Sequence, residues 1–211
     1  MTAGEIMHQL RLELWHITYA RYLEQELFSW QWWAIAAFLA VLYVVWWRFV
    51  DKGRLVEILL FGSFVSVMSA VVDIWGVTTA HWQYNIRLLP LLPAPFPFDY
   101  TAVPIAMMLV YQYCPRWSSY LAWSAAIAAL FSFGLAPLLR VAGINTFFNW
   151  NFGYYFVILM AYATIARSVI LLTLKAAADR AETRYASRFP PLAQPAAKPL
   201  PDEEAEGTSE E

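Results

Sequence analysis

The chain contains the long apolar run WQWWAIAAFLAVLYVVWWRFV, residues 30–50. A helix needs about 20 consecutive apolar residues to cross the hydrocarbon core of a bilayer, and this stretch has that length. Tryptophans gather at both of its ends, where their amphipathic rings favour the headgroup region, and Arg48 and Asp51 mark where the run stops. The stretch therefore predicts a membrane-spanning helix.

The rest of the chain repeats this pattern. Of its 211 residues, 60% are hydrophobic and only 14% are charged, whereas a soluble domain carries about 25% charged residues. Further apolar runs cover residues 55–79, 98–114, 117–139 and 153–174. We predict an all-α integral membrane helix bundle, residues 29–174, with about five transmembrane helices. The run at 98–114 is short and contains Pro104, so four spans are the alternative.

The same composition excludes several classes of protein. Cys114 is the only cysteine, so no intrachain disulfide can form. The three histidines, His8, His16 and His81, are too few and too scattered for a metal site. A glycine-rich phosphate loop, a serine nucleophile elbow and a basic nucleic-acid-binding face are all missing from the sequence. We therefore expect no metal, no cofactor and no nucleic-acid partner.

Two polar segments flank the predicted bundle. Residues 1–28 predict an amphipathic N-terminal helix on the membrane surface, which Thr2 and Glu5 would begin as a capping box. After the last span, arginines at every fourth position predict a cytoplasmic helix extension, residues 175–189. Residues 190–211 are rich in proline and acidic side chains and predict a disordered tail. This tail offers a docking segment for a protein partner.

The distribution of basic residues predicts the orientation in the membrane. Lysines and arginines are concentrated on the side that carries the C-terminus, whether the chain has five spans or four. Because positive residues favour the cytoplasmic side, we predict a multi-pass membrane protein with a cytoplasmic C-terminus. The loop at 80–99 would lie outside with five spans and inside with four. Its prolines and apolar residues indicate that it lies at the interface or re-enters among the helices.

One face of the run at 55–79 carries small and polar residues. On a helical wheel these fall within one arc and form a predicted helix-packing face: Gly62, Ser63, Ser66, Ser69, Asp73 and Gly76. Asp73 is also a functional candidate, because an ionisable group in a membrane helix is costly. The alternative is a structural partnership of Asp73 with Arg87, Arg140 or a neighbouring hydroxyl.

A second group of candidates lies in and after the 80–99 loop. The predicted ligand-binding residues are Trp82, Tyr84, Arg87, Asp99, Tyr111 and Gln112. The aromatic members are equally typical of interfacial anchors, and Asp99 could simply cap the helix that follows it. Asp73 and Asp99 are the two candidates for a catalytic acid.

Four motifs of the chain stand out together: His81-Trp82-Gln83-Tyr84, Pro97-Phe98-Asp99, Pro104 and Tyr111-Gln112-Tyr113. In these motifs the chain resembles an uncharacterised family of small multi-span membrane proteins of endospore-forming bacilli and clostridia. The resemblance covers roughly residues 55–174, and it implies a protein of the bacterial cell membrane but no known activity. A fainter similarity links the W-x-Y element to the lycopene-cyclase membrane domain, in which paired acidic residues begin a helix. Here Tyr100 follows Asp99, so the second acid is missing.

These features favour a membrane protein that binds a membrane lipid, an apolar ligand or a protein partner without catalysing a reaction. The alternative is a carotenoid-cyclase-like membrane enzyme that acts on an isoprenoid-like lipid, with Asp99 or Asp73 as the general acid. A small-solute transporter is the third interpretation. It is disfavoured because the predicted spans contain no inverted repeat and few intramembrane charges.

Overall fold

The chain is seen in a computed structural model that describes residues 2–91, 98–148 and 150–188. Its contacts divide the chain into two compact units, Met1–Leu172 and Thr173–Glu211. The first unit contains the helix bundle and all of the candidate site residues. The second unit begins within the last helix.

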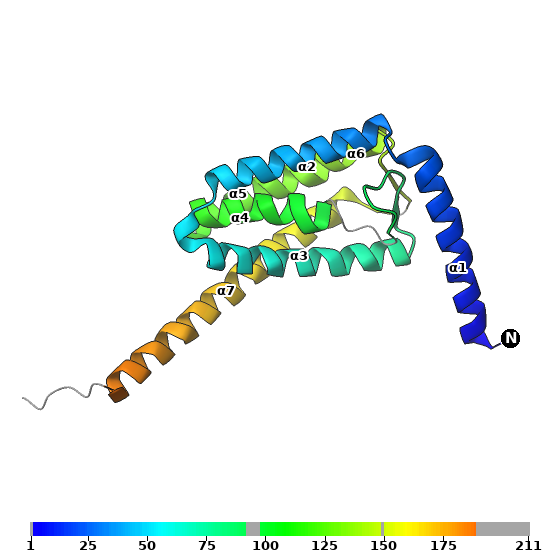
Figure 1. Cartoon of the computed structure of the whole chain (residues 1–211). Helices are drawn as coiled ribbons and strands as arrows, with labels where there is room; N and C mark the ends of the chain where they lie inside the picture. The colour runs from blue at the N-terminus through cyan, green and yellow to red at the C-terminus, as the bar shows by residue number, and fades with distance from the viewer. Residues whose placement is uncertain (1, 92–97, 149, 189–211) are drawn as a thin grey trace, which may run out of the picture. The chain divides into compact units, whose positions relative to one another are not determined.

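Four helical segments among the described residues are long and apolar enough to cross a membrane (Figure 1). They are α2 (Trp30–Phe49), α3 (Leu55–Thr78) with the turn Lys52–Arg54 before it, α5 (Trp117–Ala129) with α6 (Ala136–Val141), and the apolar part of α7 (Phe152–Arg188). A π-helical turn, Leu130–Leu135, joins α5 to α6. The predicted all-α membrane bundle is confirmed.

The ends of α2 follow directly from the local sequence. The hydroxyl of Ser29 accepts a hydrogen bond from the backbone N–H of Trp32 at 3.2 Å and so caps the start of the helix. At the other end, Val50 has extended backbone dihedrals and stops the helix. The carboxylate of Asp51 then accepts from the N–H of Gly53 at 2.9 Å, which forms the tight turn into α3.

The segment predicted as a span at 98–114 is shorter than the other four. It consists of a π-helical turn, Phe98–Ala102, and the 11-residue helix α4 (Val103–Tyr113). At about 1.5 Å per residue this segment is roughly 24 Å long, less than the ~30 Å of a hydrocarbon core. By helix length, the described residues therefore contain the four spans of the alternative rather than five.

The short helix α4 lies in the interior of the bundle. Most of its side chains are buried, and it contacts α2, α3 and α5. At its C-terminal end, the Gln112 amide and the Tyr113 hydroxyl both donate to the carbonyl of Phe49, each at 2.9 Å. Surrounding helices thus shield a segment that is too short to span the bilayer by itself.

The main hydrophobic core lies between α3, α4, α5 and α7. Each of these helices contributes a large, fully buried side chain: Phe61, Met107, Tyr120 and Leu159. Gly62 lets α3 approach α4 closely, because a Cβ at this position would lie 2.5 Å from the sulfur of Met108. The buried hydroxyl of Tyr120 donates to the carbonyl of Ala163 on α7 at 2.7 Å, so this polar group is satisfied inside the core.

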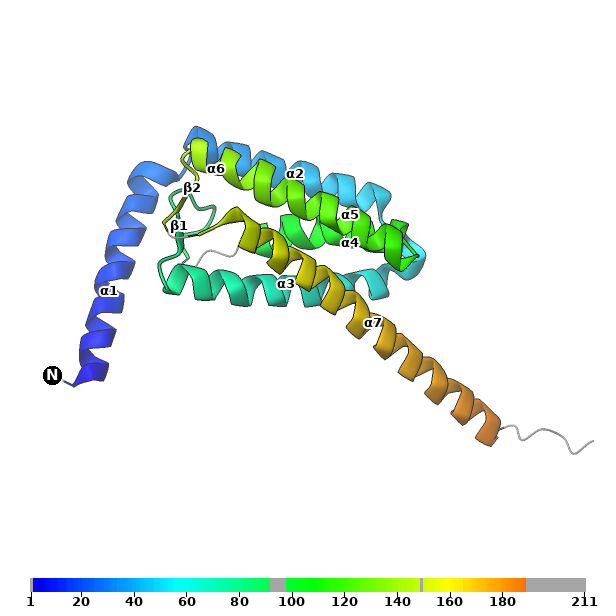
Figure 2. The same ribbon diagram turned by 180° about the vertical axis from the view of Figure 1, so that it is seen from behind.

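A two-stranded antiparallel sheet connects the loops at one end of the bundle. β1 (Trp82–Tyr84) pairs with β2 (Asn145–Phe147), with Tyr84 opposite Asn145. Gly143 shapes the turn before β2 with a φ of 72°, which glycine adopts without strain. Figure 2 shows both strands at the end of the bundle from which α1 extends.

Helix α1 (Ala3–Arg21) begins with the capping box that the sequence predicts. The Thr2 hydroxyl accepts from the N–H of Glu5 at 3.3 Å, and the Glu5 carboxylate accepts from the N–H of Thr2 at 2.7 Å. Its apolar side chains are largely exposed, for example Ile17 at 67%. That α1 lies on a membrane surface stays a prediction.

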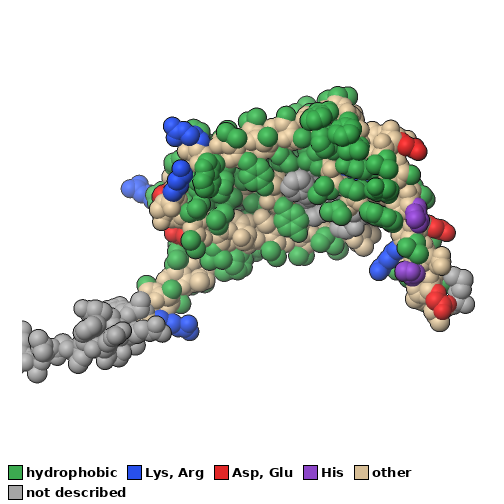
Figure 3. All heavy atoms as spheres, in the orientation of Figure 1, with side chains coloured by type: hydrophobic (Ala, Val, Ile, Leu, Met, Phe, Trp, Pro, Cys, Tyr) green, Lys and Arg blue, Asp and Glu red, His purple; other side chains and the backbone are tan. Residues whose placement is uncertain are grey.

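Hydrophobic side chains cover most of the helix surfaces that Figure 3 shows. On α3, Val56 is 82% exposed and Val71 is 61% exposed. Lysine and arginine side chains gather at the end of the bundle where α2 meets α3. An apolar surface bounded by charged ends suits contact with the hydrocarbon of a bilayer.

The predicted packing face of α3 is turned inward only in part. Its buried members are Gly62, Ser69, Asp73 and Gly76. Ser66 is half-buried, whereas Ser63 is exposed, contrary to expectation. The hydroxyl of Ser63 donates to the carbonyl of Leu59 one turn earlier, at 2.8 Å. Because this bond lies within its own helix, Ser63 needs no partner from another helix.

The structure describes only part of the C-terminal segment. Helix α7 is described up to Arg188, so the predicted helix extension at 175–189 falls on a helix for all but its last residue. The predicted disordered tail, residues 190–211, lies outside the described residues. Its role as a docking segment for a protein partner stays a prediction.

Candidate ligand-binding cavity

Two buried carboxyl groups lie at the end of the bundle that carries β1 and β2. Asp73, near the C-terminal end of α3, is 3% exposed, and Asp99, in the π-helical turn Phe98–Ala102, is 7% exposed. The hydroxyl of Ser69 donates to Oδ1 of Asp99. Since Ser69 stands one helical turn before Asp73, this bond brings the two acids to the same place in the fold.

Asp73 receives two hydrogen bonds from β1. The indole N–H of Trp82 donates to Oδ1 of Asp73 at 2.9 Å, and the hydroxyl of Tyr84 donates to the same oxygen at 2.6 Å. Side chains two residues apart in a strand point to the same side, so the W-x-Y spacing brings both donors to one carboxyl group. The second oxygen, Oδ2 of Asp73, is buried and has no hydrogen-bond partner among the described residues.

Gly76 provides the space in which Trp82 lies. A Cβ at Gly76 would be 1.9 Å from a carbon of the Trp82 ring, which no real structure allows. The indole therefore passes directly over the backbone of α3 and reaches Asp73, three residues earlier. The sequence predicts that Gly76 packs against another helix, but here a strand residue fills the space.

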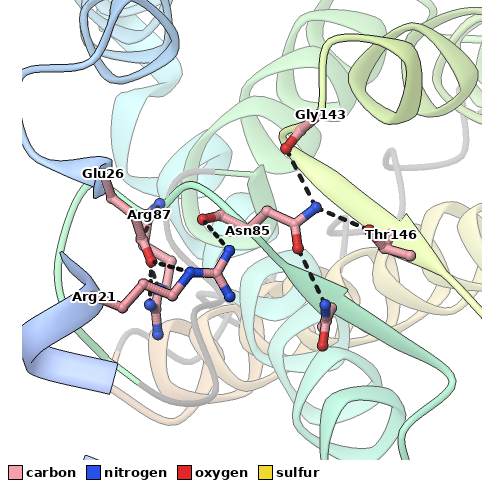
Figure 4. A network of polar contacts seen from close by, with 7 residues as sticks. Arg21, Glu26, Asn85, Arg87, Gly143 and Thr146 are labelled. Carbon is pink, nitrogen blue, oxygen red and sulfur yellow. Dashed lines mark hydrogen bonds and ion pairs between the residues drawn. The ribbon is translucent and has the colours of Figure 1, made fainter. Parts of the chain in front are cut away.

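The strand pair that carries these donors is held together by Asn85 (Figure 4). Its side-chain amide donates to the carbonyl of Gly143 at 3.2 Å and to the hydroxyl of Thr146 at 2.8 Å. The amide of Gln83 donates to the Asn85 side-chain oxygen at 3.1 Å. The position of β1, and hence of its two donors, depends on a segment about 60 residues away in the chain.

A cavity beside the two carboxyl groups is lined mainly by aromatic and aliphatic side chains. Its lining consists of Ser69, Val72, Asp73, Trp82, Tyr84, Phe98, Asp99, Phe131, Leu135, Ala136, Leu139, Asn145, Phe147, Trp150, Tyr155 and Tyr162. Trp150 meets Trp82 edge-on, with ring centroids 4.7 Å apart. The side-chain oxygen of Asn145 is buried and unpaired within the described part of the chain. Large apolar faces with a few polar groups are typical of small-molecule sites.

Two π-helical turns contribute to the wall of this cavity. One is Phe98–Ala102, which carries Asp99, and the other is Leu130–Leu135, which carries Phe131. A π-helical turn adds a residue to a helix and is frequent at functional sites. The added residue rotates everything that follows, so a regular helical wheel cannot assign these side chains to a face.

Within the part of the chain that the structure describes, no lysine or arginine pairs with Asp73 or Asp99. Arg87, one of the predicted partners of Asp73, pairs with Glu26 instead (Figure 4). The Arg87 backbone N–H and Nε donate to Oε2 of Glu26 at 3.0 and 2.9 Å. Arg21 lies 3.6 Å from the other oxygen of Glu26. The carboxyl groups of the cavity thus have no cationic partner among the residues that the structure describes.

The Tyr84 hydroxyl stands close to both acids. Burial raises the pKa of the Tyr84 phenol well above its ordinary value of about 10. The charges of Asp99 and Asp73 raise this pKa further, because a phenolate beside a carboxylate is repelled. Tyr84 therefore keeps its proton over the whole ordinary pH range and remains a hydrogen-bond donor.

The structure brings together only some of the ligand-binding residues that the sequence predicts. Trp82, Tyr84 and Asp99 line the cavity. Tyr111 instead donates to Glu57 at 2.6 Å, in the first turn of α3. Gln112 lies beside it and binds the α2–α3 turn. Both stand at the opposite end of α3 from Asp73 and do not line the cavity, and Arg87 is paired with Glu26.

Several lining residues were missed from the sequence. Tyr155 and Tyr162 lie two helical turns apart on α7, and this seven-residue spacing is a signal for one shared face. Asn145 and Trp150 carry no such signal. They reach the cavity because β2 pairs with β1, and that pairing joins residues far apart in the chain.

No family model matches this chain, and no curated protein or solved structure is significantly similar to it.

Proposed function

We propose that this chain is a multi-pass protein of the bacterial membrane that binds a small apolar ligand in the cavity beside Asp73 and Asp99. The observation that carries this proposal is the combination of an aromatic-lined cavity with a buried acid oxygen, Oδ2 of Asp73, that lacks a partner among the described residues. Buried polar atoms are nearly always hydrogen-bonded, so an unpaired one at a cavity supports a missing partner there.

The walls favour a ligand that is mostly hydrocarbon. Val72, Leu135 and Leu139 line the cavity together with several aromatic rings. Transfer of apolar surface from water to such walls contributes about 25 cal/mol per Å². A ligand that already partitions into the bilayer suits a cavity formed within membrane helices.

Photolabelling tests this proposal. The purified protein in uncharged maltoside micelles is irradiated with neopentylbenzene that carries a diazirine, and the labelled residues are mapped by peptide mass spectrometry. We expect labels on cavity residues such as Trp82, Phe131 and Tyr155, and competition by an excess of unlabelled neopentylbenzene.

Two neighbouring valines provide a matched pair of variants. Val72 lines the cavity, whereas Val71 is 61% exposed on the outer face of α3. Val72→Phe should fill the cavity and remove most of the competed labelling, while Val71→Phe should leave it unchanged. Labelling confined to outward-facing residues, or equal labelling of both variants, would overturn the proposal.

A membrane enzyme that acts on an isoprenoid-like lipid is the second candidate function. The sequence lacks a second acid directly after Asp99, but Asp73 lines the same cavity. Ser69, one helical turn before Asp73, donates a hydrogen bond to Asp99. A protonated Asp99 could give its proton to a polyene double bond, and aromatic faces would stabilise the resulting carbocation until it returns a proton to the carboxylate. Cyclised product from a polyene, abolished by Asp99→Asn, would support this function over simple binding.

A further inference from the structure

The acids and rings of the cavity identify a narrower class of ligand. We propose that the cavity binds a hydrophobic organic cation, that is, an ammonium group attached to an apolar body. This proposal rests on the proposed ligand-binding function and adds the chemical class of the ligand.

The two carboxyl groups of the cavity favour a cationic ligand. Asp73 and Asp99 are nearly fully buried, and their hydrogen-bond donors are the neutral groups of Trp82, Tyr84 and Ser69. These donors leave Oδ2 of Asp73 unpaired among the described residues. Burying a carboxylate without a counter-charge is strongly unfavourable, so a cation that enters the cavity gains a large electrostatic stabilisation.

The aromatic side chains of the cavity also favour a cationic ligand. Trp82, Trp150, Tyr155 and Tyr162 line the same cavity as the two acids. The faces of such rings attract ammonium groups, most strongly where water is excluded, and they do so without demanding hydrogen bonds. This environment suits a substituted ammonium group, whose methyl or methylene groups also gain from apolar contact.

The two arginines that are buried among the described residues are engaged elsewhere. Arg87 is held by the carboxylate of Glu26. Arg167 is bound to the carbonyl oxygens of Cys114 and Pro115, at the other end of α4 from Asp99, and lies 4.3 Å from the ring centroid of Tyr120. Neither side chain is therefore placed to compete with a ligand cation for Asp73 or Asp99.

A pair of isosteric probes separates charge from shape. Benzyltrimethylammonium carries a quaternary nitrogen where neopentylbenzene carries a quaternary carbon, and the two molecules are otherwise alike. We would measure the dissociation constants of both probes for the full chain in maltoside micelles, by competition with the photolabel. The expected result is that the cation binds at least about tenfold more tightly than its neutral isostere.

Substitutions then test which residues recognise the positive charge of the ligand. The double variant Asp73→Asn/Asp99→Asn keeps the size and hydrogen-bonding capacity of both side chains and should abolish the preference for the cation while retaining neutral-probe binding. Glu57→Gln is the control, because Glu57 is paired with Arg54 in the first turn of α3, away from the cavity. That variant should keep the preference of the wild type.

Each outcome has a defined meaning. Equal affinities of the wild type for the two probes, or a preference that survives the double variant, would overturn the cation proposal and leave the proposed function intact. Failure of both probes to bind would overturn both. If the double variant does not fold, the wild-type affinity ratio and the two single variants decide the matter.

Discussion

Two buried acidic clusters lie at the same end of this bundle: Glu26 with its partner Arg87, and the pair Asp73 and Asp99. They differ in whether a cation neutralises the acid. Glu26 is completely buried, but Arg87 contacts it through three donors and neutralises its charge. Asp73 and Asp99 are buried almost as deeply, and their partners among the described residues are neutral. The neutralised cluster joins two segments of the chain, whereas the other faces a cavity.

This difference separates a structural role from a binding role. A buried ion pair with complete hydrogen bonding satisfies itself and needs no ligand. A pair of buried acids with only neutral partners can keep a proton or take up a cation, and titratable groups in such perturbed environments are concentrated at functional sites. The four experiments below test this contrast, in order of decreasing effect.

Removing the cation of the neutralised cluster should have the largest effect. Arg87→Met leaves the buried carboxylate of Glu26 with only the half-exposed Arg21, 3.6 Å away, as a counter-charge. Loss of one partner of a buried pair costs about 3–5 kcal/mol. We expect a large fall in thermal stability and in the yield of monodisperse protein. The double variant Glu26→Gln/Arg87→Met removes both charges and should recover much of the loss. If Arg87→Met is as stable as the wild type, the pair is not structural.

Filling the space beneath Trp82 should have the next largest effect. Gly76→Ala places a methyl group where the indole lies, so Trp82 must move and its bond to Asp73 must break. Overpacking of this kind costs about 1–3 kcal/mol. Tryptophan fluorescence and melting temperature would show the change. Gly134→Ala is the control, because its Cβ would meet only Leu130 at 3.4 Å and should be tolerated.

High pH should weaken the fold through Tyr84. Its folded-state pKa is raised, so below about pH 10 the phenol is protonated in both folded and unfolded protein and stability does not depend on its titration. Above that pH only the unfolded form loses the proton, and stability falls by up to about 1.4 kcal/mol per pH unit. Melting temperatures between pH 9 and pH 11, taken as an approximate window, should fall less steeply in Tyr84→Phe than in the wild type. Parallel slopes would show that Tyr84 ionises freely.

The smallest effect is expected when an acid of the cavity is neutralised. Asp73→Asn loses no ion pair and keeps an oxygen that can accept from Trp82 and Tyr84. Stability should change by less than about 1 kcal/mol, or rise. Glu26→Gln, measured beside it, should cost more because it leaves Arg87 buried and unpaired. Equal losses in the two variants would remove the distinction between the clusters.

The helices themselves were accessible from the sequence because they depend on local patterns. The run at 30–50 predicts α2, and the observed helix is Trp30–Phe49. The segment at 98–114 shows where this reasoning stops. Its apolar composition predicts a span, but the π-helical turn at its start and its short length place it inside the bundle. Composition alone does not distinguish a lipid-facing helix from one surrounded by protein.

Part of the site was also accessible. Asp73, Asp99 and the W-x-Y element stand out because ionisable and aromatic residues are conspicuous in an apolar chain. Arg87, Tyr111 and Gln112 do not line the cavity with them, because each of these side chains has a partner elsewhere: Glu26, Glu57 and the α2–α3 turn. A list of unusual residues does not state which of them meet.

From the amino-acid sequence alone it follows that this protein is a helical membrane bundle, because the length and apolarity of each helix are local properties of the chain and match the thickness of a bilayer. The sequence singles out Trp82 and Tyr84 as a W-x-Y element, but it is the structure that places them in a strand, where they point to the same side. The tertiary structure also shows that these donors meet Asp73, that Asp99 lies beside it, and that Arg87 pairs with Glu26. Those contacts depend on strand pairing, helix packing and π-helical turns, which join distant residues and shift the helical register.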